Sequence, residues 1–323
     1  MYSDIFEFFD LDKEFSEAGY FEIEHFDKFI KDIKSALYKG GLLALVGMVG
    51  IGKTTSLRRL QQILRHEKEI IVSKSFSVDK GRVNLSTLIS ALFYDLATQK
   101  DFKIPTQSEK RDRALCDLIG KSKKPIALFV DEAHDLHINT LVGLKRLVEL
   151  AHDSSGKITI VLIGHPKLKN DLRSPIMEET GARAKVFDLQ GIVGHEKRFI
   201  EWMLEQCSKP KLKPHDIFSE DAIVLLAERL ISPLQIIHYS WRALEEAFLV
   251  GERPVGVEIV KEVLSSNLND LEPKLARHGY NVRILPEQLH ARPHDVKSFL
   301  RGTLASEART KDFHEQIKKL GIA

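Results

Sequence analysis

Hydrophobic positions along the chain follow two different periods, which alternate between residues 41 and 191. Short apolar runs predict strands at 42–46, 69–72, 126–130, 158–163 and 185–189. Amphipathic stretches between them predict helices near 54–66, 85–97, 110–120 and 140–151. Because strands that alternate with helices pair in parallel, this region is expected to be an α/β domain with helices on both faces of one sheet.

The flanking regions show only the helical period. Before the α/β body, apolar residues recur at helical spacing at Phe26, Phe29, Ile30, Ile33 and Leu37. After it, helices are predicted at 195–207, 220–230, 233–250 and 257–264, followed by a further helical piece. We therefore expect an N-terminal helical segment (1–40), the α/β body (41–191), a helical lid (192–270) and a helical C-terminal module (271–323).

Composition fits an ordinary globular protein. Of the 323 residues, 43% are hydrophobic and 29% are charged, which excludes wholesale disorder. The longest apolar stretch covers residues 42–51, far short of the roughly 20 residues that span a bilayer. The start of the chain is acidic, unlike a signal peptide, and the 2 cysteines are too few for a disulfide scaffold. These features predict a cytoplasmic protein without a membrane partner.

Charge is spread unevenly although the net charge is only +2. From Glu272 onward, ten Lys and Arg residues stand against six Asp and Glu residues. A basic end behind a near-neutral body is compatible with an anionic partner, and equally with an ordinary solvated surface.

A glycine-rich loop follows the first predicted strand. The run from Gly47 to Thr54, Gly-Met-Val-Gly-Ile-Gly-Lys-Thr, matches the phosphate-loop pattern between a strand and a helix. Its glycines let backbone N–H groups turn toward phosphates, Lys53 can reach the β- and γ-phosphates, and Thr54 can ligate Mg²⁺. The expected ATP-binding residues are Gly47, Gly50, Gly52, Lys53, Thr54 and Thr55.

A second motif lies 78 residues downstream of Lys53. The apolar strand at 126–130 ends in Asp131 and Glu132, the Walker B arrangement. Asp131 is expected to hold Mg²⁺ and Glu132 to activate the attacking water. The sequence Asp-Glu-Ala-His also matches a motif of one group of RNA helicases. A helicase of that group would need a second RecA-like domain, whereas the sequence that follows is predicted to be mostly helical.

Together these motifs resemble an AAA+ ATPase. More narrowly, three short sequence segments resemble those of the transposition ATPases of the TniB, TnsC and MuB type and their ExeA-like relatives. These segments are Val130–Leu136, Leu162–Leu168 and Gly181–Phe187. The resemblance covers roughly residues 19–267. It implies an AAA+ phosphate-loop sheet, a helical lid, Mg²⁺-dependent ATP hydrolysis and assembly of the chain with copies of itself as a ring or a filament.

The resemblance also assigns roles to three single residues. His165 falls at the sensor-1 position, where the alternative is a histidine that caps a turn with Pro166. Arg183 falls where the family places its arginine finger, with Arg173 as the alternative. The sequence departs from the wider family at sensor 2, because Gln235 stands where an arginine is frequent. Gln235 can bond a phosphate but brings no charge, which favours a slow switch over a powerful motor.

Two regions are candidates for contact with duplex DNA. Lys80 and Arg82 follow the second strand, a region that faces DNA in the transposition ATPases, with Lys145 and Arg146 as weaker candidates. In the C-terminal module, two short helices would place Leu285, Leu289, Val296 and Leu300 inward. They would leave His290, Arg292, Lys297 and Arg301 outward, as in a helix-turn-helix or in a small protein-interaction module.

The resemblance leads to one main functional hypothesis and two alternatives. The main hypothesis is an ATP-dependent DNA-binding ATPase that oligomerises on duplex DNA and recruits or activates a transposase. One alternative is a secretion-associated ATPase similar to ExeA, and the other is a nucleotide-gated interaction switch without a DNA role.

Overall fold

The chain forms two compact units, each built from separate stretches of sequence. A computed structural model describes residues 2–74, 83–97, 103–174, 177, 184–264, 271–281, 284–300, 304 and 306–322. By contacts between residues, one unit comprises 24–47 and 53–189, and the other comprises 1–23, 48–52 and 190–323. We call them the sheet unit and the helical unit. The linear division of the chain into four parts stays a prediction.

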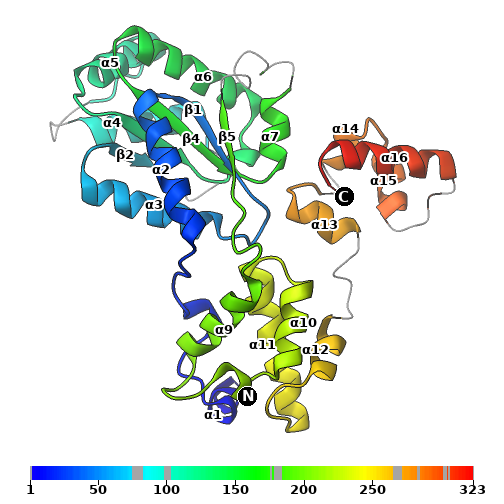
Figure 1. The fold of residues 1–323 in the computed structure, drawn as a ribbon. Helices are drawn as coiled ribbons and strands as arrows, with labels where there is room; N and C mark the ends of the chain where they lie inside the picture. Colours follow the sequence, from blue (N-terminus) through cyan, green and yellow to red (C-terminus); the bar gives the residue numbers. More distant parts are fainter. Residues whose placement is uncertain are drawn as a thin grey trace. The chain divides into compact units, whose positions relative to one another are not determined.

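The sheet unit contains five parallel strands in the order β2-β3-β4-β1-β5 (Figure 1). They are β1 (Gly41–Val46), β2 (Ile71–Lys74), β3 (Ile126–Val130), β4 (Ile158–Gly164) and β5 (Lys185–Asp188). All five predicted strands are present, although β2 begins two residues later than expected. Because the strands are parallel, their carboxyl ends meet at one edge, where ligands bind in sheets of this kind.

Helices cover both faces of the sheet, as the hydrophobic pattern predicts. One core packs the sheet against α4 (Leu85–Leu96), α5 (Ser108–Lys121) and α6 (Ile138–Asp153), with α7 (Lys167–Leu172) at its end. The other core packs the sheet against α2 (Glu24–Lys39) and α3 (Lys53–Glu67). Successive residues of β1 alternate between the two cores, as side chains of a strand must, so both faces of the strand are apolar. This confirms the predicted α/β architecture.

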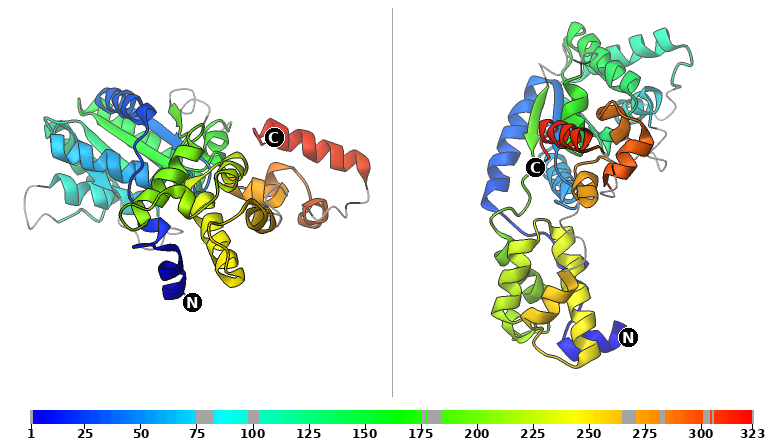
Figure 2. Two further views of the ribbon diagram at one scale, coloured as in Figure 1. Left: turned by 60° about the horizontal axis from the view of Figure 1, so that its bottom comes forward. Right: turned by 90° about the vertical axis from the view of Figure 1, so that its right-hand side faces the viewer.

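The helical unit has its own apolar core, which combines residues 5–18 with residues 192–263. Figure 2 shows the blue N-terminal helix beside the yellow helices of this unit. Its elements are α1 (Tyr2–Phe9), η1 (Phe15–Glu17), α9 (Glu196–Cys207), η5 (Pro214–Asp216), α10 (Glu220–Arg229), α11 (Pro233–Val250) and α12 (Val257–Leu264). Ile5 and Phe9 of α1 are fully buried against this core, and Trp202 and Trp241 pack on it. The two tryptophans are therefore core residues, as expected.

The C-terminal helices enclose a separate small core. They are α13 (Leu271–Arg277), α14 (Leu285–Gln288), α15 (Pro293–Leu300) and α16 (Glu307–Lys319). Leu285, Leu289 and Val296 are buried in that core, while Leu300 is only partly buried. The predicted outward residues that the structure describes are all exposed: His290, Arg292 and Lys297. Arg301 lies outside the described residues.

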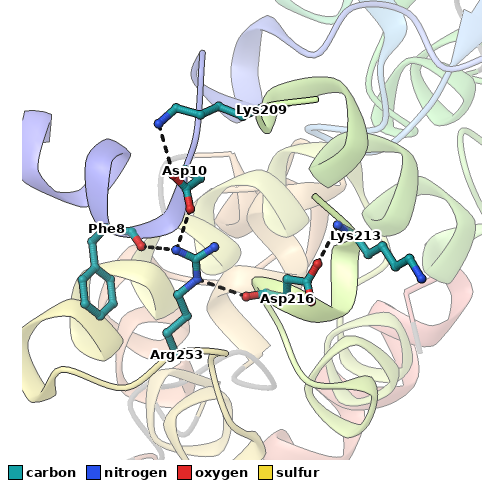
Figure 3. A network of polar contacts seen from close by, with 6 residues as sticks. All are labelled: Phe8, Asp10, Lys209, Lys213, Asp216 and Arg253. Carbon is teal, nitrogen blue, oxygen red and sulfur yellow. Dashed lines mark hydrogen bonds and ion pairs between the residues drawn. The ribbon is translucent and has the colours of Figure 1, made fainter. Parts of the chain in front are cut away.

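Arg253 ties the N-terminal segment into the helical unit (Figure 3). Its guanidinium donates to the carbonyl of Phe8, pairs with a carboxylate oxygen of Asp10 at 2.9 Å and donates through Nε to the carbonyl of Asp216 at 3.3 Å. Lys209 pairs with the other carboxylate oxygen of Asp10 at 3.1 Å. These contacts hold the end of α1 over the core in which its apolar side chains are buried.

The same network should make the stability of the protein sensitive to acid. The hydrogen bonds from Arg253 and then Lys209 lower the pKa of Asp10 below its ordinary value. A carboxyl group with a lowered folded-state pKa stabilises the fold above its unfolded pKa, and this contribution is lost as the pH falls through the folded pKa. We expect the free energy of unfolding, measured by urea denaturation, to fall below about pH 4, and to fall less in Asp10→Asn.

Asp12→Asn is the matched control, because Asp12 is an exposed neighbour with no recorded part in this network. The control should keep the acid sensitivity of the unmodified protein. An identical pH profile in Asp10→Asn would show that this ion pair does not contribute.

In the part of the chain that the structure describes, no helix is long and apolar enough to cross a membrane.

Candidate nucleotide site

The phosphate loop begins where β1 ends, at the carboxyl edge of the sheet. The N–H of Gly47 donates to the carbonyl of Gly164 at 3.1 Å, which fixes the start of the loop beside the end of β4. Gly50 and Gly52 have φ angles of +79° and +96°, a region that side-chain-bearing residues rarely adopt. Helix α3 then begins at Lys53. The glycines of the motif are thus required by the backbone itself.

Gly50 also has no room for a side chain. A Cβ atom there would lie 2.6 Å from Cβ of Leu234, whose N–H donates to the carbonyl of Gly50 at 3.3 Å. The next residue, Gln235, is the sensor-2 candidate, and its side-chain oxygen accepts a hydrogen bond from the N–H of Ile231 at 3.3 Å. The first turn of α11 therefore packs on the middle of the phosphate loop, within the helical unit.

Lys53 is buried at the base of the site. Its side chain donates to the carbonyl of Gly47 at 3.0 Å, and only 9% of the residue is exposed. Burial lowers the pKa of Lys53, whereas the charges of Glu132 and Asp131 act to raise it. The predicted cation is therefore held close to both predicted carboxylates. Thr54 and Thr55, which follow it, are exposed.

Strand β3 delivers the two carboxylates to the same edge of the sheet. All five of its residues are buried, so the first polar side chains lie where the strand ends. The N–H of Glu132 donates to Oδ1 of Asp131 at 2.9 Å. Glu132 itself has φ 53° and ψ 37°, the left-handed conformation, which is uncommon for a residue with a side chain and concentrates at functional sites.

Two histidines flank the carboxylate of Glu132. His134 lies in η3 (Ala133–Asp135), and its Nδ1 is 3.5 Å from Oε2 of Glu132. His165 directly follows β4, and its Nε2 is 3.7 Å from the same oxygen. The two imidazole rings stack with centroids 3.8 Å apart and planes inclined by 20°. The two histidines therefore flank the carboxylate on two sides.

Burial lowers the pKa of both imidazoles. Burial is the main cause that lowers the pKa of His134, and it outweighs the neighbouring carboxylates Asp135 and Glu132. Burial also lowers the pKa of His165 to about 4, with His134 and Lys53 adding to the effect. Neutral imidazoles offer lone pairs as well as N–H donors, so this pair can bond a phosphate oxygen, a water molecule or a metal ion.

The site has the donors that ATP and Mg²⁺ require. The buried ammonium group of Lys53 suits phosphate oxygens, while the exposed hydroxyl of Thr54 and the carboxylate of Asp131 suit Mg²⁺. Within the sheet unit, the structure brings together Lys53, Asp131, Glu132 and His165. Arg183, Lys80 and Arg82 lie outside the described residues. Arg173, the alternative to Arg183, is exposed at the C-terminal end of α7.

Sequence reasoning missed His134 as a member of the site. His134 occurs only as a letter of two motifs, neither of which gives it a role, although its position three residues after Asp131 could have placed it beside the strand end. His134 packs closely against the backbone at Gly164. A Cβ atom at position 164 would lie 3.3 Å from Nδ1 of His134, so a glycine fits best there.

Comparison with known proteins supports an AAA+ ATPase. Residues 36–172 match the family described as AAA domain. Over 152 residues the chain is 32% identical to General secretion pathway protein A of Aeromonas hydrophila, a match that covers 45% of this chain but only 26% of that protein. The chain therefore spans about a quarter of the length of this curated relative.

Solved structures show the same fold at low sequence identity. The ORC2 protein of Aeropyrum pernix superposes with a TM-score of 0.56 at 14% identity, over 92% of this chain and 85% of that one. A Drosophila ORC structure bound to DNA superposes with a TM-score of 0.53 at 12% identity, over 99% and 79% of the two chains. The fold is thus that of AAA+ proteins, a phosphate-loop sheet combined with a helical module.

Proposed function

We propose that this protein is a Mg²⁺-dependent ATPase whose ATP-bound form assembles on duplex DNA and regulates transposition. The enzymatic part rests on one observation: Lys53, Asp131 and Glu132 converge at the carboxyl edge of the sheet, next to a loop whose glycines have left-handed backbones. A nucleoside triphosphate and its metal ion need these donor groups. Their order along the chain, the phosphate loop first and the two carboxylates later, is that of the two motifs.

Each residue of the set has a distinct task. Lys53 would balance the charge of the β- and γ-phosphates, while Thr54 and Asp131 would hold Mg²⁺, which when bound neutralises phosphate charge. Glu132 would orient the attacking water and accept its proton. His165, beside Glu132, would bond a γ-phosphate oxygen. The proposed contribution of Gln235 is a neutral hydrogen bond, so closure of the lid would respond only weakly to the γ-phosphate.

Two features support the assignment of duplex DNA as a partner. The C-terminal module carries four more basic than acidic residues, and two of its basic residues are exposed at α15: Arg292 directly precedes this helix and Lys297 lies on it. One structure with the same fold, the Drosophila ORC, is bound to DNA. Lys80 and Arg82 are the proposed phosphate contacts of the α/β body, and phosphate contacts of this kind are blind to sequence.

The proposed protein partner is a transposase, and the proposed active form is a homo-oligomer. Both rest on the resemblance of the Walker B, sensor-1 and arginine-finger regions to transposition ATPases. In that arrangement the ATP-bound assembly is the signal and hydrolysis dismantles it, which fits a site without a charged sensor 2.

The second candidate function is a secretion-associated ATPase. It is favoured by one specific observation, the 32% identity to General secretion pathway protein A over 152 residues. Stimulation of ATP hydrolysis by duplex DNA distinguishes the two candidates, since only a DNA-dependent switch requires it. A nucleotide-gated interaction switch would also show no stimulation.

Anisotropy of a labelled duplex tests the DNA partner directly. We expect the full chain to bind the duplex in a salt-dependent manner, and more tightly with a non-hydrolysable ATP analogue. Lys80→Ala/Arg82→Ala should remove the nucleotide-dependent part, whereas Arg292→Ala/Lys297→Ala should weaken the nucleotide-independent part. The logarithm of the association constant should fall linearly with the logarithm of the salt concentration. If each pair of residues contacts two phosphates, each double variant should make this slope less steep by about 2.

Lys318→Ala/Lys319→Ala is the matched control for the C-terminal variant. It removes the same charge from exposed positions at the end of α16 and should leave the slope unchanged. Equal losses in the control and the test variant would mean that only the overall charge matters. Binding unaffected by all three variants would contradict the proposed DNA contacts.

A further inference from the structure

Three donor groups of the site converge on one point, and one of them, His134, has no role in the proposed hydrolysis of ATP. Glu132, His134 and His165 each present one ligand atom, and these atoms all lie within 4.8 Å of one another. Glu132 and His134 lie in the turn that follows β3, and His165 follows β4, so the ends of two paired strands place the three residues. Such a cluster of two imidazoles and one carboxylate is the donor set of many zinc sites.

An unpartnered buried nitrogen atom gives a second, independent indication of a ligand. Nδ1 of His134 is inaccessible to solvent and has no hydrogen-bond partner in the structure. Only 10% of the His134 side chain is exposed, and its unpartnered Nδ1 is directed at Glu132, 3.5 Å from Oε2. Because a buried polar atom without a partner costs free energy, a bound group that accepts its lone pair would stabilise this arrangement.

We propose that Glu132, His134 and His165 form a binding site for Zn²⁺ or a similar borderline-soft divalent cation, distinct from the Mg²⁺ ligands Thr54 and Asp131. Zinc bonds of about 2.0–2.2 Å in a tetrahedron place ligand atoms about 3.3–3.5 Å apart. The observed separations from Oε2 of Glu132, 3.5 and 3.7 Å, are close to this value. Rotation of the stacked rings out of their parallel arrangement would direct both lone pairs at one ion.

The chemistry of the donors selects against Mg²⁺ at this point. Magnesium prefers an octahedron of oxygen ligands, whereas imidazole nitrogens favour zinc and its transition-metal neighbours. Three protein ligands leave a fourth tetrahedral position open for water.

Occupation of this site would withhold the carboxylate of Glu132 from the attacking water. This consequence rests on the proposed ATPase function, whereas the metal site itself does not. Bound Zn²⁺ would permit nucleotide binding at Lys53 but block hydrolysis, so the metal would hold the protein in its ATP-bound form.

Metal binding is tested on the full chain without nucleotide. Zn²⁺ competes with a chromogenic chelator, and Co²⁺ reports ligand geometry through its visible absorption. We expect one high-affinity Zn²⁺ per chain and a tetrahedral Co²⁺ spectrum. His134→Ala and His165→Ala should each weaken Zn²⁺ binding at least about tenfold, and Glu132→Gln should do the same with the least change to packing.

His152→Ala is the matched control, because His152 is exposed on α6 and belongs to no such cluster in the described part of the chain. It should bind Zn²⁺ as the unmodified protein does. Equal Zn²⁺ affinity in all four variants, or an octahedral Co²⁺ spectrum, would overturn the proposal.

A second experiment measures ATP hydrolysis in the presence of Mg²⁺. Zn²⁺ is added at concentrations around the dissociation constant found in the chelator competition. Inhibition that is lost in His134→Ala is expected. An inactive protein that still binds Zn²⁺ through these residues would contradict the proposed ATPase function and leave the metal site supported.

Discussion

Replacing Glu132 by glutamine should slow the hydrolysis of ATP about a thousandfold while nucleotide binding stays close to that of the unmodified protein. Binding depends on the phosphate loop, Lys53 and the metal ligands, and none of these groups is altered. Turnover additionally needs a base beside the γ-phosphate, and an amide cannot accept the proton. The carboxylate of Glu132 lies between the two histidines, with Oε2 3.5 Å from His134 and 3.7 Å from His165.

Phosphate release under single-turnover conditions measures the rate, and a fluorescent ATP analogue measures binding. Glu149→Gln serves as the control, since Glu149 is exposed on α6 and its loss should change neither quantity. Hydrolysis of Glu132→Gln at the unmodified rate would refute the assignment of the base.

Arg183→Ala should lose hydrolysis by at least about a thousandfold and still bind ATP. The reason is that an arginine finger acts across a subunit boundary, on the nucleotide of a neighbouring copy. Lys53→Ala has the complementary defect, because it removes the buried cation that balances the phosphates. Mixing the two variants should restore part of the activity, since some mixed interfaces combine an intact loop with an intact finger.

The mixing experiment is read together with the dependence of specific activity on protein concentration. Activity that rises with concentration, plus rescue in the mixture, supports a ring or a filament. A flat dependence without rescue would favour a monomeric switch. Arg173→Ala, at the exposed end of α7, is the control and should retain activity.

Much of the sheet unit could be predicted because its signals are local. The apolar runs gave every strand, since in a parallel sheet both faces of a strand are buried and the run is continuous. The phosphate loop and the Walker B carboxylates could be identified because their spacing is fixed by the chemistry of phosphates and Mg²⁺. Helices α9 to α12 could be located within a residue or two from their amphipathic period.

The strand order, the role of His134 and the packing of α1 could not be predicted. They depend on contacts between residues far apart in the sequence, and a local hydrophobic pattern contains no information on such contacts. The strand order places β1 between β4 and β5, and hydropathy contains no information on such neighbours. The role of His134 depends on its stacking with His165, thirty-one positions away in the chain. Helix α1 joins the core of the helical unit through Ile5 and Phe9, which pack in one cluster with apolar residues beyond position 190.

The split construction of the helical unit affects how the protein is made on the ribosome. Ile5 and Phe9 leave the ribosome well before most of their core, which follows residue 190. At synthesis rates of about 5–20 residues per second, the apolar face of α1 is exposed for on the order of ten seconds or more. Strand β1 waits in the same way, because both its partners, β4 and β5, are translated more than a hundred residues later. The nascent chain therefore presents two apolar segments that chaperones can bind before either unit is complete.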